Sequence, residues 1–125
     1  MKKLNRPIFL DLTKITLPIP ALISILHRVS GVALLFSLPF ILPILSHIKY
    51  GNFVTYMMFL NTTLGSILLW LIATGFIYHL LSGVRHLISD VVSGESLSFC
   101  RLTAKITLAL SLILSVMLFY TWVIL

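Results

Sequence analysis

Residues 63–90 read TLGSILLWLIATGFIYHLLSGVRHLISD, a stretch apolar enough to cross a bilayer that nevertheless carries ionisable side chains toward its end. Ionisable groups at membrane depth are unfavourable and usually serve a function there. Two of them, His79 and His86, are seven residues apart. At about 100° per residue they lie within roughly 20° of each other on one helix face. This face is a candidate wall of a cofactor site.

The composition of the whole chain indicates an integral membrane protein. Of the 125 residues, 59% are hydrophobic and only 10% are charged, so a water-soluble fold would have too little polar surface to cover its apolar side chains. Three stretches reach the roughly 20 apolar residues that a spanning helix needs. We expect one all-α membrane-anchor domain over 1–125, with a cytoplasmic head at 1–20 and transmembrane helices at about 21–47, 63–87 and 104–124.

The distribution of the net charge of +6 is typical of a membrane protein and not of a nucleic-acid-binding protein. The connecting segment 48–62 has only one basic residue, Lys49. All other Lys and Arg residues precede or open the first span or flank the connection between the second and third spans: Lys2, Lys3, Arg6, Lys14, Arg28, Arg85, Arg101 and Lys105. The positive-inside rule therefore predicts a cytoplasmic N-terminus and an external C-terminus. We expect membrane lipid, and no nucleic acid, as a partner.

The predicted depths of the histidines separate them. At 1.5 Å per residue, His79 lies about 22 Å from the outer start of its span, and His86 lies about 10 Å further in. His27 is expected at the cytoplasmic interface, displaced from His79 by several ångströms or more. The chain then offers one deep imidazole, and a six-coordinate haem would need its second axial ligand from another chain. A metal hydrolase is disfavoured because no carboxylate or cysteine accompanies His79 at its depth. Alternatively, His79 is a packed histidine that bonds to a neighbouring helix.

A second group of polar residues opens the first predicted helix. Ser24, His27 and Arg28 are spaced i, i+3, i+4, so they share a face and present a hydroxyl, an imidazole and a cation at the membrane edge. Arg85 and His86 are expected at the same depth. A donor-rich rim above an apolar crevice suits a quinone head or the propionates of a haem. Alternatively, Arg28 and Arg85 reach phospholipid headgroups and fix the orientation of the chain.

Three segments together resemble a known family: Arg-Pro at 6–7, SILHRVSG at 24–31 and HLLSGVRHLISD at 79–90. They are similar to the signature regions of the cytochrome b subunits of succinate dehydrogenase, respiratory complex II, and the resemblance extends over the whole chain. It implies a bacterial-type cytoplasmic (inner) membrane protein that pairs with a second small membrane-anchor subunit and holds one haem b between the two. It also implies part of a ubiquinone site beneath an iron–sulfur subunit and a flavoprotein subunit of this tricarboxylic acid cycle enzyme.

The resemblance assigns roles to individual residues of the two longer segments, SILHRVSG at 24–31 (the first motif) and HLLSGVRHLISD at 79–90 (the second motif). His79 matches the histidine that is an axial ligand of the haem iron. Ser24 and Arg28 match the serine and arginine that contribute to the quinone site. Other motif residues become candidates, together with Arg28, for the surroundings of the haem propionates or the quinone: His27, Arg85 and His86.

The implied function is anchoring and electron transfer within a succinate:quinone oxidoreductase, without the dehydrogenase active site itself. Two alternatives remain open. One is the anchor of a fumarate reductase, because motifs of the anchor do not set the direction of the reaction. The other is a haem-free structural anchor in which His79 only packs. A transporter or proton-channel subunit is disfavoured because the ionisable side chains cluster at one interface.

Overall fold

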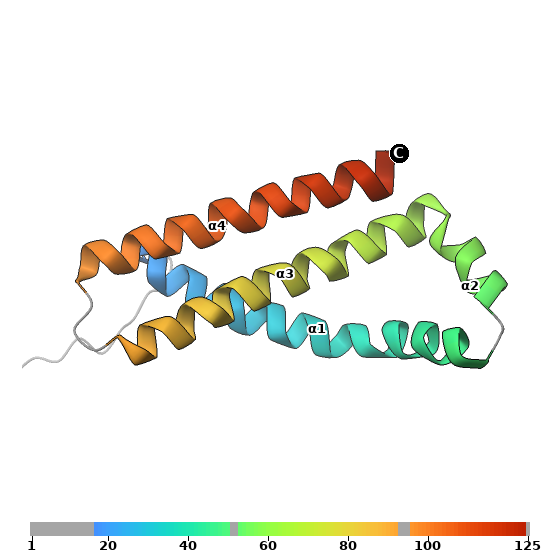
Figure 1. The fold of residues 1–125 in the computed structure, drawn as a ribbon, viewed down its shortest axis with the longest axis horizontal. Helices are drawn as coiled ribbons and strands as arrows, with labels where there is room; N and C mark the ends of the chain where they lie inside the picture. Colours follow the sequence, from blue (N-terminus) through green and yellow to red (C-terminus); the bar gives the residue numbers. More distant parts are fainter. Residues whose placement is uncertain (1–16, 51–52, 93–95, 125) are drawn as a thin grey trace, which may run out of the picture.

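The computed structural model describes residues 17–50, 53–92 and 96–124. Throughout these ranges the regular structure is helical: α1 (Ile19–Tyr50), α2 (Phe53–Leu60), α3 (Thr63–Val91), α4 (Leu97–Phe119) and the π-helical turn η2 (Tyr120–Ile124). Figure 1 shows α1, α3 and α4 running along the long axis, with α2 at one end of the bundle. The predicted all-α fold is confirmed, whereas most of the predicted head at 1–20 lies outside the described residues.

Three helices are long and apolar enough to cross a membrane. They cover Ile19–Ser46, Thr63–Val91 and Leu97–Ile124, with mean hydropathies of 2.1, 1.9 and 2.1. The second and third helices extend past the predicted spans because helical hydrogen bonding continues into polar interfacial residues. Ser96, for example, caps α4 by accepting a hydrogen bond from the backbone N–H of Phe99, at 3.3 Å.

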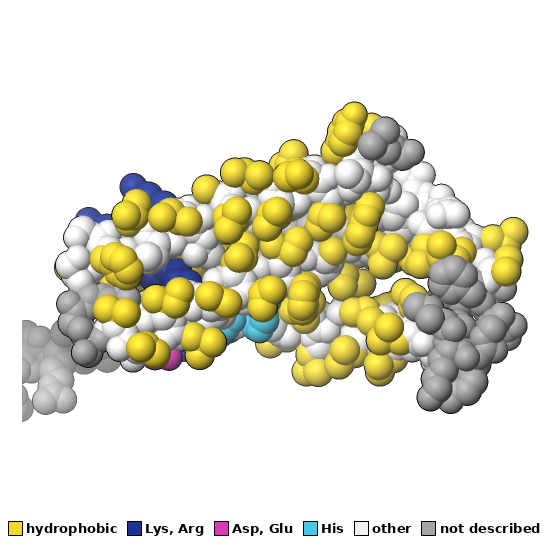
Figure 2. All heavy atoms as spheres, in the orientation of Figure 1, with side chains coloured by type: hydrophobic (Ala, Val, Ile, Leu, Met, Phe, Trp, Pro, Cys, Tyr) yellow, Lys and Arg dark blue, Asp and Glu magenta, His cyan; other side chains and the backbone are white. Residues whose placement is uncertain are grey.

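Most of the apolar surface faces outward. Figure 2 shows hydrophobic side chains spread over the visible face of the bundle, and the side chains of Leu35 and Phe36 on α1 are 64% and 72% exposed. Such a surface is stable only against lipid tails or other transmembrane helices. The chain is therefore a multi-pass membrane protein.

The α3–α4 contact is built from small and hydroxyl-bearing side chains. Small residues let helix backbones approach closely in a membrane, where polar side chains bond across helices. The indole Nε1–H of Trp70 donates to the carbonyl oxygen of Ser115 at 2.9 Å, and the hydroxyls of Thr74 and Ser115 lie 2.9 Å apart. The buried residues of α4 recur at helical spacing along this contact: Ala104, Thr107, Ser111 and Ser115.

The turn between α2 and α3 is tight. Thr62 caps α3, since its hydroxyl oxygen accepts from the backbone N–H of Gly65 at 3.1 Å, and the hydroxyl donates to the carbonyl oxygen of Phe59 at 2.6 Å. Gly65 is buried, and a Cβ at this position would collide with the same carbonyl oxygen and lie 2.9 Å from Leu60 Cα. The close approach of the end of α2 therefore requires glycine at residue 65.

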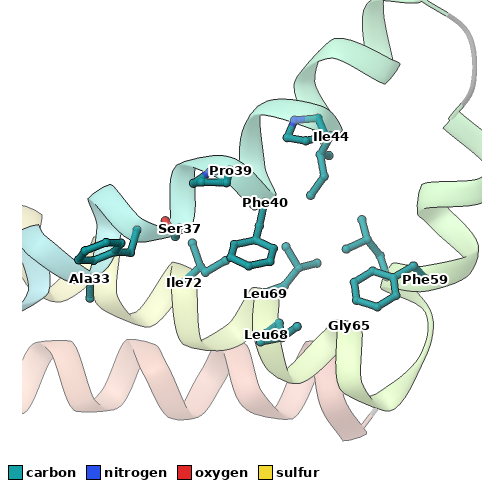
Figure 3. A pocket seen from close by; sticks show the side chains of 13 residues that line it. Ala33, Ser37, Pro39, Phe40, Ile44, Phe59, Gly65, Leu68, Leu69 and Ile72 are labelled. Atoms are coloured by element: carbon teal, nitrogen blue, oxygen red, sulfur yellow. The ribbon is translucent and has the colours of Figure 1, made fainter.

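The bundle opens toward α2. A cavity of about 370 Å³ lies between α1, α2 and α3, and its lining is mostly apolar. Phe40 of α1, Phe59 of α2 and Leu69 of α3 line it and are labelled in Figure 3. At the opposite half of the bundle, α1 and α3 are in close contact, and this contact contains the motif residues.

Candidate functional site

Three histidines from the two motifs meet where α1 packs against α3. The ring of His27 stacks on that of His79, with centroids 4.2 Å apart and an interplanar angle of 16°. His27 also contacts His86, with centroids 5.2 Å apart and the rings tilted by 43°. All three side chains are half-buried. Figure 2 shows histidine side chains reaching the surface in the half of the bundle that carries the visible Lys and Arg side chains.

This arrangement corrects the predicted separation of His27 from His79. Helix α3 continues to Val91, so His79 lies about 18 Å, and His86 about 7.5 Å, from the end of α3. His27 lies about 12 Å from the start of α1 at Ile19. Its depth is therefore intermediate, and it contacts both histidines of α3. The prediction was wrong because it placed His27 at the cytoplasmic interface, whereas His27 lies about two turns into α1, at a depth between those of His86 and His79.

The hydrogen bonds of His79 define its chemistry. The Nδ1 atom lies 3.1 Å from the carbonyl oxygen of His27 and 3.1 Å from Ser30 Oγ. A carbonyl oxygen can only accept a hydrogen bond, so Nδ1 is the donor in the first contact. In the neutral imidazole the lone pair then belongs to Nε2, the nitrogen that is available to a metal.

Two glycines let the motifs interlock. A Cβ at Gly31, in the first motif, would lie 2.9 Å from Cε1 of His79, in the second. A Cβ at Gly83, in the second motif, would lie 3.4 Å from Nε2 of His27, in the first. Each histidine thus packs on the glycine of the other motif. Sequence reasoning missed both glycines and Ser30, because their importance depends on a contact between distant segments.

Arg85 does not join the histidines. Its side chain is buried and faces α4, where Nε donates to Thr103 Oγ1 and Nη2 donates to the carbonyl oxygen of Cys100, each at 3.3 Å. The expectation that Arg85 shares a rim with His27 is corrected by these contacts. Helical spacing could have shown this, since six residues at about 100° each turn Arg85 roughly 120° away from His79.

The quinone-site candidates lie on α1 beside the histidine cluster. Ser24 is half-buried and Arg28 is exposed. Among the residues that the structure describes, Arg28 forms no ion pair, so its guanidinium can meet an anionic or oxygen-bearing ligand. Tyr78, which the sequence did not single out, donates its hydroxyl hydrogen to the carbonyl oxygen of Ile23 at 3.1 Å. This bond ties α3 to the turn of α1 that carries Ser24.

The cluster does not form a complete metal centre by itself. Within the described ranges, no three His, Cys, Asp or Glu side chains are arranged to hold a metal ion. A metal bound at Nε2 of His79 would take its other ligands from a cofactor or from another chain. The described residues therefore define a membrane protein with three spanning helices and a candidate ligand-binding face near one end.

The comparisons with known proteins agree with this class. Residues 2–118 match the family described as the succinate dehydrogenase/fumarate reductase transmembrane subunit. The chain is 33% identical to the succinate dehydrogenase cytochrome b556 subunit of Rickettsia felis, over 91% of this chain and 90% of the relative. It is 30% identical to the cytochrome b556 subunit of Coxiella burnetii, over 87% and 90%. It is 36% identical to the cytochrome b560 subunit of Porphyra purpurea, over 74% and 77%.

The chain belongs to the succinate dehydrogenase/fumarate reductase transmembrane subunits and, within them, to the cytochrome b subunits that anchor complex II in the membrane. The resemblance seen in the two motifs is confirmed.

Proposed function

We propose that this chain holds one haem b through His79 and forms part of a ubiquinone-reduction site in electron transfer from succinate to ubiquinone. The observation that carries the haem assignment is the contact of His79 Nδ1 with the carbonyl oxygen of His27, at 3.1 Å. A metal-bound histidine typically donates its other ring N–H to such a partner, which fixes the ring and raises the basicity of the ligating nitrogen. The relatives named cytochrome b support a haem at this place.

The residues around His79 fit a haem. Gly31 leaves room for the imidazole ring itself, and this ring is only half-buried, so a second anchor subunit can cover its exposed part. The bound haem would supply one-electron redox chemistry. We propose that a second small anchor subunit covers this face and provides the other axial ligand. His27, His86 and Arg28 then provide N–H donors for the propionates.

The proposed orientation has the N-terminus in the cytoplasm of a bacterium and the third span ending outside. It rests on the basic residues that flank the histidine-bearing half of the bundle. The histidine cluster then lies in the cytoplasmic half of the inner membrane. An iron–sulfur subunit, itself joined to a flavoprotein subunit, would bind above it and deliver electrons to the quinone.

Ser24 and Arg28 would act directly on the quinone. They are four residues apart on α1, so they lie on one face. The Ser24 hydroxyl would donate a hydrogen bond to a quinone carbonyl oxygen. The Arg28 guanidinium would stabilise the negative charge that develops on that oxygen during reduction, because a fixed cation in a water-poor site needs little reorganisation.

The haem assignment is tested by the dithionite-reduced minus oxidised optical spectrum of the complex, purified through a tag on this chain. We expect a b-type α band. An intact complex with no haem band would contradict the haem assignment and leave this chain as a quinone-site anchor at most.

The quinone assignment predicts that Ser24→Ala and Arg28→Leu slow succinate:quinone reduction. We expect about a tenfold loss for Ser24→Ala, where one neutral hydrogen bond is removed, and about a hundredfold loss for Arg28→Leu. The measurement is the quinone-reductase rate and the KM for ubiquinone, with succinate oxidation by a soluble acceptor as the internal control. Arg101→Leu, an exposed arginine at the start of α4, is the matched control. Parental turnover and KM in both site variants would contradict the assignment.

A further inference from the structure

We infer that Ser30 is a positioning residue for His79, holding its imidazole in the tautomer that exposes the Nε2 lone pair. This inference rests on the proposed haem ligation by His79 and deepens it. The hydroxyl of Ser30 lies 3.1 Å from His79 Nδ1 and donates to the carbonyl oxygen of His27 at 2.8 Å. The three polar groups therefore form a closed triangle between α1 and α3.

Counting hydrogens fixes the direction of each bond in the triangle. Ser30 has one hydroxyl hydrogen, and the His27 carbonyl takes it. Ser30 Oγ can then only accept from His79 Nδ1. The same carbonyl also accepts from Nδ1, at 3.1 Å, so the Nδ1–H has two acceptors. The opposite tautomer would place the Nδ1 lone pair against the lone pairs of the carbonyl oxygen, and the Ser30 hydroxyl hydrogen would have to leave that carbonyl to satisfy Nδ1.

The surroundings of the ring strengthen this constraint. The His79 imidazole is packed between the stacked ring of His27 and the backbone at Gly31, the residue that follows Ser30. Hydrogen bonds are electrostatically stronger in a low-dielectric interior than in water. Adjacent residues of α1 thus supply both a polar and a steric constraint on one ring.

When His79 Nδ1–H donates a hydrogen bond to an acceptor such as Ser30 Oγ, Nε2 donates more electron density to a bound metal. Stronger donation favours the oxidised iron, so loss of the Ser30 acceptor should raise the midpoint potential of the haem. The carbonyl of His27 remains in place in a Ser30 variant. His79 should therefore still ligate the haem in this variant. Removing a hydrogen-bond partner of a ligating histidine typically weakens metal binding by about 10- to 100-fold, and we expect a loss of haem affinity near the lower end, about tenfold.

The experiment is a redox titration of the haem α band in the purified complex, together with the haem content per chain after extensive washing. Three variants test the hydroxyl: Ser30→Ala removes the acceptor, Ser30→Cys replaces it with a weak one, and Ser30→Thr restores it. Ser37→Ala is the matched control, since the Ser37 hydroxyl also lies on α1 and donates to the carbonyl oxygen three residues earlier, that of Leu34, at 2.7 Å.

We expect a higher midpoint potential and weaker haem retention in Ser30→Ala, a smaller shift in the same direction in Ser30→Cys, and parental behaviour in Ser30→Thr and Ser37→Ala. A parental potential in Ser30→Ala, or an equal shift in Ser37→Ala, would overturn the inference while leaving the haem assignment intact. A parental complex without haem would overturn the haem assignment itself, and with it the role of Ser30.

Discussion

His79→Ala is expected to abolish or shift the b-type α band of the assembled complex, with the other subunits still co-purifying. The variant removes the imidazole that we propose as the haem ligand, and we expect the helices α1 and α3 to remain in place. The His27 ring, with its centroid 4.2 Å from that of His79, is the nearest substitute ligand. A shifted band would therefore indicate that His27 has replaced His79 as a ligand of the haem iron. The measurement is the reduced-minus-oxidised spectrum beside a gel of the purified subunits.

His86→Ala is the control for this prediction. His86 lies on the same face of α3, and its ring contacts His27 with centroids 5.2 Å apart. The variant removes the imidazole of His86 but leaves that of His79, which the carbonyl of His27 orients. We expect the α band to persist in His86→Ala. An unaltered band in His79→Ala, with intact subunit composition, would make His79 a packing residue.

Gly65→Ala is expected to destabilise the chain by about 3 kcal/mol, near the upper end of the range for overpacking. The added methyl collides with the carbonyl oxygen of Phe59 and lies 2.9 Å from Leu60 Cα. These are backbone atoms, which cannot rotate away as the tip of a flexible side chain can. The end of α2 must move, and the capping bonds of Thr62 must break or lengthen with it. The measurement is the thermal unfolding of the purified complex in detergent.

Gly75→Ala is the matched control, because Gly75 also lies within α3 and a Cβ there meets only Leu34 Cδ2, at an ordinary 4.0 Å. We expect parental stability in this variant, since alanine also favours a helix over glycine. On the proposed assignment, haem should still be present in the Gly65→Ala molecules that fold, because Gly65 lies about 21 Å from His79 along α3. Equal unfolding temperatures for the two variants would contradict the steric argument.

The sequence predicts the three spanning helices well because a bilayer imposes a simple requirement on length and hydropathy, but it does not predict α2, which lies in the connecting segment 48–62. It predicts their ends less well. Ser96 begins α4 through a local capping bond, and residues 88–91 continue α3 although Asp90 is charged. Neither the cap at Ser96 nor the continuation of α3 past its apolar residues can be read from the length of an apolar run.

The site was predictable in its residue types but not in its contacts. The meeting of His27 with His79 depends on how far each residue lies from the end of its own helix. The prediction placed His27 at the interface instead of about two turns into α1, and this separated the predicted positions of the two rings. The direction of Arg85 follows from helical spacing alone and could have been found. The part played by Ser30 could not, because its partner is 49 residues away in the sequence.

The interlocking of Gly31 with His79 and of Gly83 with His27 has a consequence for biosynthesis. The carbonyl of His27 and the imidazole that it orients are 52 residues apart. At a synthesis rate of about 5–20 residues per second, the first motif exists for roughly 3 to 10 s before the second has been made. The proposed binding face forms only when α3 packs against α1, so we expect binding of a haem there to follow insertion of both helices.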